Sequence, residues 1–147
     1  MNAQIIDRLR QHTADNLVLW VKLHNLHWNL RGSQFKAVHE LTESYYDELA
    51  EDYDALAERL VQLKAKPPVS LKSSLALSGF PELERDAFAV AEAIGIVRAD
   101  FEKLLKEYRT TRALAAEAGD SSTEALLVDI VARLEKELWM LEASQEK

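Results

Sequence analysis

The chain has 147 residues, of which 48% are hydrophobic and 29% are charged, and it contains only four Gly and three Pro. This composition excludes disordered and fibrous proteins and predicts a single helical domain spanning residues 1–147. The net charge of −7 at pH 7 disfavours a nucleic-acid partner, and the absence of Cys excludes disulfides and thiolate metal sites. Since we find no signal peptide and no apolar run of membrane-spanning length, we expect a soluble, cytoplasmic protein with no membrane partner.

Two long helices are predicted in the first half of the chain. Apolar residues recur at helical spacing over residues 3–30, and the turn Arg31-Gly32-Ser33 should end this first helix. A second helix should run from Gln34 to Lys66-Pro67-Pro68, because proline disfavours its continuation. The residues expected to face the core are Ile6, Leu9, Leu17, Trp20 and Leu23 in the first helix, and Val38, Leu41, Tyr45, Leu49, Leu56, Leu60 and Leu63 in the second.

A long connection and two further helices follow. Residues 65–80 should contain a short packed helix, indicated by Leu71, Leu75 and Leu77. The third helix should open with Pro81 and end near Gly119, and the sequence STE at 122–124 after Ser121 is typical of a capping box opening the fourth. The residues expected to face the core are Phe88, Ala91, Ile94, Phe101, Leu105 and Tyr108, then Leu127, Ile130, Leu134, Leu138 and Leu141.

Short turns within the two helix pairs and a long link between them are typical of a ferritin-like bundle. The predicted fold is therefore all-α: a ferritin-like four-helix bundle with a short extra helix in the long crossover.

The histidines His12, His24, His27 and His39 all lie in the first 39 residues. A di-iron site inside a four-helix bundle typically uses Glu-x-x-His on two helices, and this sequence contains no Glu-x-x-His. Any metal site should therefore use the first two helices. Taken alone, each histidine of the first helix is most simply a surface or hydrogen-bonded core residue.

The second helix carries a stripe of mostly polar residues beside its apolar one: His39, Glu43, Tyr46, Ala50, Asp54 and Glu58. At about 1.5 Å per residue, His39 and Asp54 lie roughly 22 Å apart along the axis, so they cannot share a metal within one chain. Two such helices crossing antiparallel about a two-fold axis near Glu48 and Leu49 would bring the opposite ends of the stripe together.

The stripe also has an ordinary interpretation as a solvated polar face. Two observations favour metal binding instead. His39 and Glu43 are spaced to hold one cation from successive turns, and Asp54 and Glu58 would repel each other with no basic residue four positions beyond to compensate.

Several motifs have a fixed spacing: KLHNLHWNLRG at 22–32, HEL at 39–41, DALAER at 54–59 and EKELWMLEA at 135–143. Together they closely resemble the Dps mini-ferritins, the DNA-protection-during-starvation family, over the whole chain. The resemblance implies a homo-oligomeric hollow shell, a dodecamer, with ferroxidase sites at two-fold interfaces. Such shells oxidise Fe(II), preferably with hydrogen peroxide, and store Fe(III) inside, which protects against oxidative stress.

By this resemblance, His27 and His39 are iron ligands from one subunit, and Asp54 and Glu58 are ligands from its two-fold mate. Glu43 stands where the family usually carries an acidic ligand, often Asp. Trp28 resembles the near-site tryptophan, with an electron relay and simple packing between helices as its two possible roles. Carboxylates with few imidazoles suit Fe(II) and Fe(III), although Zn and other divalent metals compete.

The resemblance also implies acidic pores for iron entry at three-fold axes, for which the candidates are Asp120, Glu124 and Asp129. Asp120 alone is more simply a helix cap.

The main alternative is a nucleoid-associated, DNA-binding and DNA-protecting protein. The family's DNA binders often use Lys-rich tails, whereas here no Lys precedes the first helix and the end, EASQEK, is not basic. We therefore expect no direct DNA binding. A third alternative is a metal-free structural dimer, which requires that the stripe of His and carboxylate residues on the second helix arose by chance.

Overall fold

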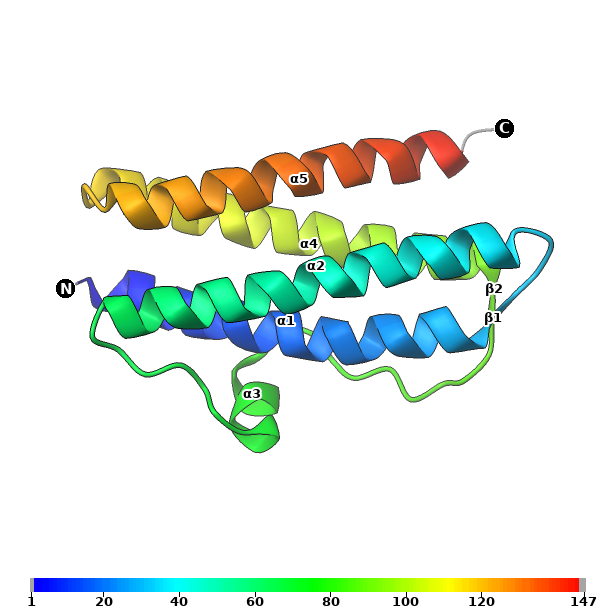
Figure 1. Cartoon of the computed structure of the whole chain (residues 1–147), viewed down its shortest axis with the longest axis horizontal. Helices are drawn as coiled ribbons and strands as arrows, with labels where there is room; N and C mark the ends of the chain where they lie inside the picture. The colour runs from blue at the N-terminus through cyan, green and yellow to red at the C-terminus, as the bar shows by residue number, and fades with distance from the viewer. Residues whose placement is uncertain (1, 146–147) are drawn as a thin grey trace.

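The computed structural model describes residues 2–145. Four long helices lie side by side, α1 (Ala3–Asn29), α2 (Phe35–Gln62), α4 (Val90–Glu117) and α5 (Ser121–Gln145), with the short α3 (Leu71–Leu77) outside them against α1 (Figure 1). The pairs α1–α2 and α4–α5 are antiparallel hairpins, and the crossover that carries α3 joins them. The predicted ferritin-like bundle with an extra helix is confirmed.

One buried core runs through all four long helices and includes most of the predicted apolar residues, among them Leu9, Leu23, Leu56, Tyr108 and Leu134. Trp20 is an exception, because it is 37% exposed while its neighbours Val18 and Leu19 are buried. Leu71, Leu75 and Leu77 are also exposed, so α3 forms as predicted but does not bury these leucines within the chain.

The third long helix begins at Val90 rather than at Pro81. The side-chain amide of Asn25 donates to the backbone carbonyls of Leu83 (2.8 Å) and Arg85 (2.9 Å). The strand β2 (Phe88–Ala89) then pairs in parallel with β1 (Leu30–Arg31). These long-range bonds hold the segment non-helical, and the first inward residue of the helix is Ala93 instead of the exposed Ala91.

Two other helix ends differ from the prediction. Helix α2 ends at Gln62, before the prolines, because Lys64 adopts a left-handed conformation (φ 63°) and Ala65 N–H bonds back to Leu60 O at 2.9 Å. Helix α5 is capped by Asp120 rather than Ser121, since Asp120 Oδ1 accepts from the backbone N–H of Thr123 at 3.1 Å.

The crossover is tied to α1 by a buried carboxylate. Asp15 Oδ1 accepts from the hydroxyl of Ser78 and from the backbone N–H of Gly79, both at 2.8 Å. These bonds position the chain between α3 and α4 against the bundle. None of the helices within residues 2–145 is both long and apolar enough to cross a membrane.

Candidate metal centre

His27 and His39 form a stacked pair where the end of α1 meets the start of α2. Their ring centroids are 3.6 Å apart and nearly parallel, at 14°. Each ring bonds to the backbone of the other residue: His27 Nδ1 lies 2.6 Å from His39 O, and His39 Nδ1 lies 2.8 Å from His27 O. The α1–α2 turn, with Gly32 at φ 145°, brings the two helices into this register.

These bonds determine the tautomer of both histidines. A carbonyl oxygen can only accept, so each Nδ1 must carry a proton, and in the neutral ring Nε2 is then the nitrogen with the free lone pair. The Nδ1–H of His27 also lies 3.0 Å from Thr42 Oγ1. Burial is the main cause that lowers the pKa of His27, which favours the neutral ring. An imidazole whose Nδ1–H is held by a backbone carbonyl presents Nε2 to a metal, and this is a common arrangement of histidine ligands.

Glu43 lies next to this pair and is hydrogen-bonded to a cluster of aromatic rings. The hydroxyl of Tyr46 donates to Glu43 Oε1 at 3.2 Å, and the Tyr46 ring stacks on His24 at 3.8 Å. Trp28 contacts His24 edge-on at 5.5 Å and is 66% exposed. Packing between helices, one of the two roles considered for Trp28, therefore does not occur within one chain.

Asp54 and Glu58 are exposed on the same helix as His39, further toward the C-terminal end of α2. Over residues 2–145, no three His, Asp or Glu side chains lie close enough to hold one metal. The structure thus brings together the two histidines and places Glu43 nearby, but it does not bring Asp54 or Glu58 to them.

The three candidate pore residues have different surroundings. The side chain of Asp120 caps helix α5 and forms an ion pair with Arg59 Nη2 at 2.9 Å. Burial alone would raise the pKa of Asp120, but hydrogen bonds from Thr123 and the charge of Arg59 lower it. Glu124 is half-buried and Asp129 is exposed.

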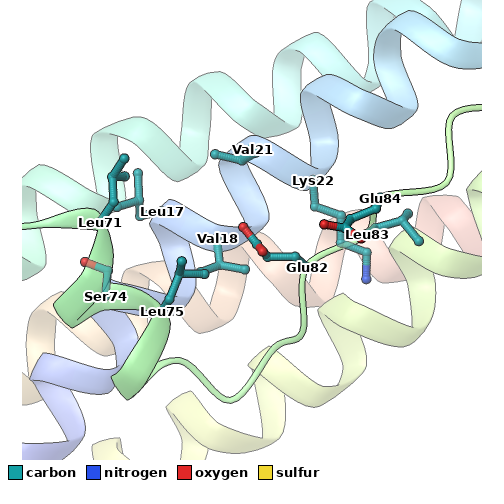
Figure 2. Close-up of a pocket in the computed structure, with 10 residues that line it drawn as sticks. All are labelled: Leu17, Val18, Val21, Lys22, Leu71, Ser74, Leu75, Glu82, Leu83 and Glu84. Atoms are coloured by element: carbon teal, nitrogen blue, oxygen red, sulfur yellow. The ribbon is translucent and has the colours of Figure 1, made fainter.

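An apolar face extends along α1 between the two ends of the stripe. A hollow of about 260 Å³ lies between α1 and α3, lined mainly by Leu17, Val18, Val21, Leu71 and Leu75, with charged residues from the crossover at one end (Figure 2). A second hollow of about 220 Å³ lies between α1 and α2, lined by Asn16, Leu17, Trp20, Ala50 and Tyr53.

Sequence reasoning gave no role to Thr42, His24 or, beyond its place in the stripe, Tyr46. Thr42 stands three residues after His39, and Tyr46 three after Glu43, so helical spacing was an available signal for both. His24 had no such signal, because its contact with Tyr46 depends on how α1 packs against α2.

Comparisons with known proteins agree with the fold. The model of the ferritin-like domain matches residues 6–147. Antigen TpF1 of Treponema pallidum (strain Nichols) is 46% identical over 142 residues, covering 97% of this chain and 80% of that protein. Its crystal structure superimposes with a TM-score of 0.97, covering 99% of this chain and 93% of that chain.

The DNA protection during starvation protein of Helicobacter pylori (strain J99) is 37% identical over 92% of this chain and 94% of its own length. The Dps structure from Vibrio cholerae O1, described as a ferritin-like diiron-carboxylate protein, is 30% identical with a TM-score of 0.92, covering 97% of this chain and 89% of that one. The chain belongs to the Dps family of ferritin-like proteins.

Proposed function

We propose that this protein is an iron-oxidising and iron-storing mini-ferritin whose metal sites form between two copies of the chain. The observation that carries the proposal is the stacked His27–His39 pair, in which both Nδ1–H groups are held by backbone carbonyls. This arrangement leaves two Nε2 lone pairs free at one end of the stripe. Two carboxylates, Asp54 and Glu58, stand exposed at the other end.

A two-fold related copy supplies the missing carboxylates. An antiparallel crossing of two α2 helices near Glu48 places Asp54 and Glu58 of the second copy opposite His27, His39 and Glu43 of the first. The exposed Trp20, Leu71 and Leu75 lie on elements that flank this crossing, so the same contact would bury them. The sites then occur in pairs, and closure of further interfaces gives a dodecameric shell.

Iron is the substrate of this site. Two Fe(II) ions give two electrons to one hydrogen peroxide, whose O–O bond breaks and which takes up two protons from solvent to form two waters. The Fe(III) product then hydrolyses, which returns protons to solvent, and collects inside the shell. A mixed carboxylate and imidazole set stabilises the harder Fe(III) product, although Zn(II) competes for the same ligands. Peroxide removed in this two-electron way yields no hydroxyl radical, which accounts for protection against oxidative stress in the cytoplasm.

The direct test is an anaerobic Fe(II) titration followed by separate additions of peroxide and oxygen, with light scattering on the same sample. We expect a species of twelve chains that binds Fe(II) at a fixed ratio and oxidises it faster with peroxide than with oxygen. Loading the metal sites with Zn(II) before Fe(II) is added should slow the oxidation of Fe(II). A stable monomer that oxidises iron at full rate would contradict the shared site.

DNA binding is expected to be absent. Each chain carries a net charge of −7, so an assembled shell repels the phosphate backbone and gains little from counterion release. In gel-shift assays at neutral pH and physiological salt, duplex DNA should migrate unchanged. Tight, salt-sensitive retardation in metal-free buffer would overturn this expectation, and retardation only with added divalent metal would indicate bridging.

A further inference from the structure

The hollow between α1 and α3 combines apolar walls with polar groups at its two ends. Its volume is about 260 Å³, and its walls are mainly the side chains of Leu17, Val18, Val21, Leu71 and Leu75. Ser74 of α3 lines one end and Glu82 of the crossover lines the other, with Leu75 between them in Figure 2. None of the candidate iron ligands lines this hollow, so it is separate from the proposed metal site.

Ser74 carries a buried hydroxyl without a partner. The residue is 1% exposed, and within residues 2–145 its Oγ makes no hydrogen bond. By contrast Ser78, one helical turn further along the chain, donates its hydroxyl to Asp15 Oδ1 at 2.8 Å. Most buried hydroxyls in proteins are hydrogen-bonded, because an unpaired one costs free energy. A ligand group that bonds to Ser74 would recover this cost.

The charges at the crossover end of the hollow favour a cation. Glu82 and Glu84 are exposed and form no ion pair with any side chain of residues 2–145, and Figure 2 shows the Glu82 carboxylate directed toward α1. Lys22 also lies at this end, but its Nζ pairs with Asp100 Oδ2 at 2.7 Å. Arg85 pairs with a carboxylate of α4 at 2.9 Å. The potential here is therefore negative, so it attracts an ammonium group and repels a carboxylate.

We propose that this hollow binds a short linear primary amine whose far end carries a hydroxyl group. The ammonium group pairs with Glu82, the methylene chain lies against the apolar walls, and the terminal hydroxyl bonds to Ser74. The volume is below the range of roughly 300–1,000 Å³ that is typical of pockets for drug-sized ligands, so the chain is limited to a few carbons. A second copy that covers Leu71 and Leu75, as proposed above, would form the outer wall of the hollow.

The test measures binding of small probes to the assembled wild-type protein by saturation-transfer NMR. From butylamine to hexylamine, each added methylene should tighten binding about four-fold, because it buries more apolar surface. Hexanoate, which has the same chain but the opposite charge, should not bind. Amino alcohols of four to six carbons test the inner end: Ser74→Ala should weaken the tightest of them about five-fold relative to the matching alkylamine, because its hydroxyl then lacks a partner.

Variants at the mouth locate the bound amine. Glu82→Gln should weaken amine binding about three-fold, whereas Asp86→Asn, which removes the same charge from an exposed crossover position outside the hollow, should have no effect. Val21→Phe fills the hollow from a half-exposed position and should abolish binding. Glu82→Gln should oxidise Fe(II) like the wild type, so this site and the proposed function can fail separately.

Three results would overturn the amine site. The first is that no amine binds the assembled wild type, which would mean that a second copy fills the hollow. The second is that hexanoate binds as tightly as hexylamine, so the charge at the mouth has no role. The third is that Val21→Phe and Glu82→Gln both bind amines as the wild type does, which would place the bound amine elsewhere.

Discussion

Two inactive variants of this chain should restore activity to each other when they are mixed. One variant carries His27→Ala and His39→Ala, and the other carries Asp54→Ala and Glu58→Ala. Each alone should lose most of its rapid peroxide-dependent Fe(II) oxidation, because neither homodimer retains a complete ligand set. In a mixed dimer, the intact histidines of one chain face the intact carboxylates of the other, so one of the two sites is rebuilt. With random assembly, about a quarter of wild-type sites should return.

The experiment co-refolds the two variants at equal ratio and confirms mixed dimers by native mass spectrometry. A matched control replaces two exposed carboxylates of α4, Glu102 and Glu117, by Ala. This control removes the same charge as the second variant and should stay active alone. No recovery in confirmed mixed dimers would mean that the histidines and carboxylates do not meet across a two-fold axis, and the shared site would have to be abandoned.

Replacing Glu137 by Gln should flatten the pH dependence of stability above pH 5. Burial, followed by a hydrogen bond to Glu48 and the charge of that residue, raises the pKa of Glu137 to about 9. The folded chain therefore keeps a proton that the unfolded chain releases above about pH 4.5. The stabilisation from this group is complete below pH 4.5 and is lost progressively as the pH rises toward 9. Gln can donate to Glu48 without taking up a proton, so it lacks this loss.

The interval from pH 4.5 to pH 8 would correspond to about 5 kcal/mol for a fully buried carboxyl. Solvent around the half-buried Glu137 reduces this effect, so at pH 8 we expect Glu137→Gln to be more stable than the wild type by about 1 to 3 kcal/mol, with little difference near pH 5. Urea unfolding at fixed protein concentration measures this, since assembly makes stability depend on concentration. The control is Glu135→Gln, two residues away on α5, whose exposed carboxylate pairs with Arg109. Equal pH profiles for the wild type and Glu137→Gln would show that the proton is not held at this position.

The helical bundle, the separation of the candidate ligands along α2 and the family could be predicted from the sequence alone, because each of them depends on local sequence patterns. Helical periodicity marks the apolar face of each long helix, and link lengths determine which helices form hairpins, so the ferritin-like bundle follows. The spacing of His39 and Asp54 sets their separation along α2 regardless of how the helix packs. The motifs from Lys22 to Arg59 were sufficient to indicate the family.

The tertiary structure decided features that depend on contacts between distant segments. The start of α4 at Val90 follows from the bonds that Asn25 makes to the crossover and from the β1–β2 pairing, neither of which has a local signature. The tautomers of His27 and His39 follow from carbonyls supplied by the opposite helix, and the exposure of Trp20 follows from the rotation of α1 in the bundle. Periodicity identifies the apolar face of a helix, but hydrogen bonds between elements decide where the helix begins and which nitrogen of a histidine remains free.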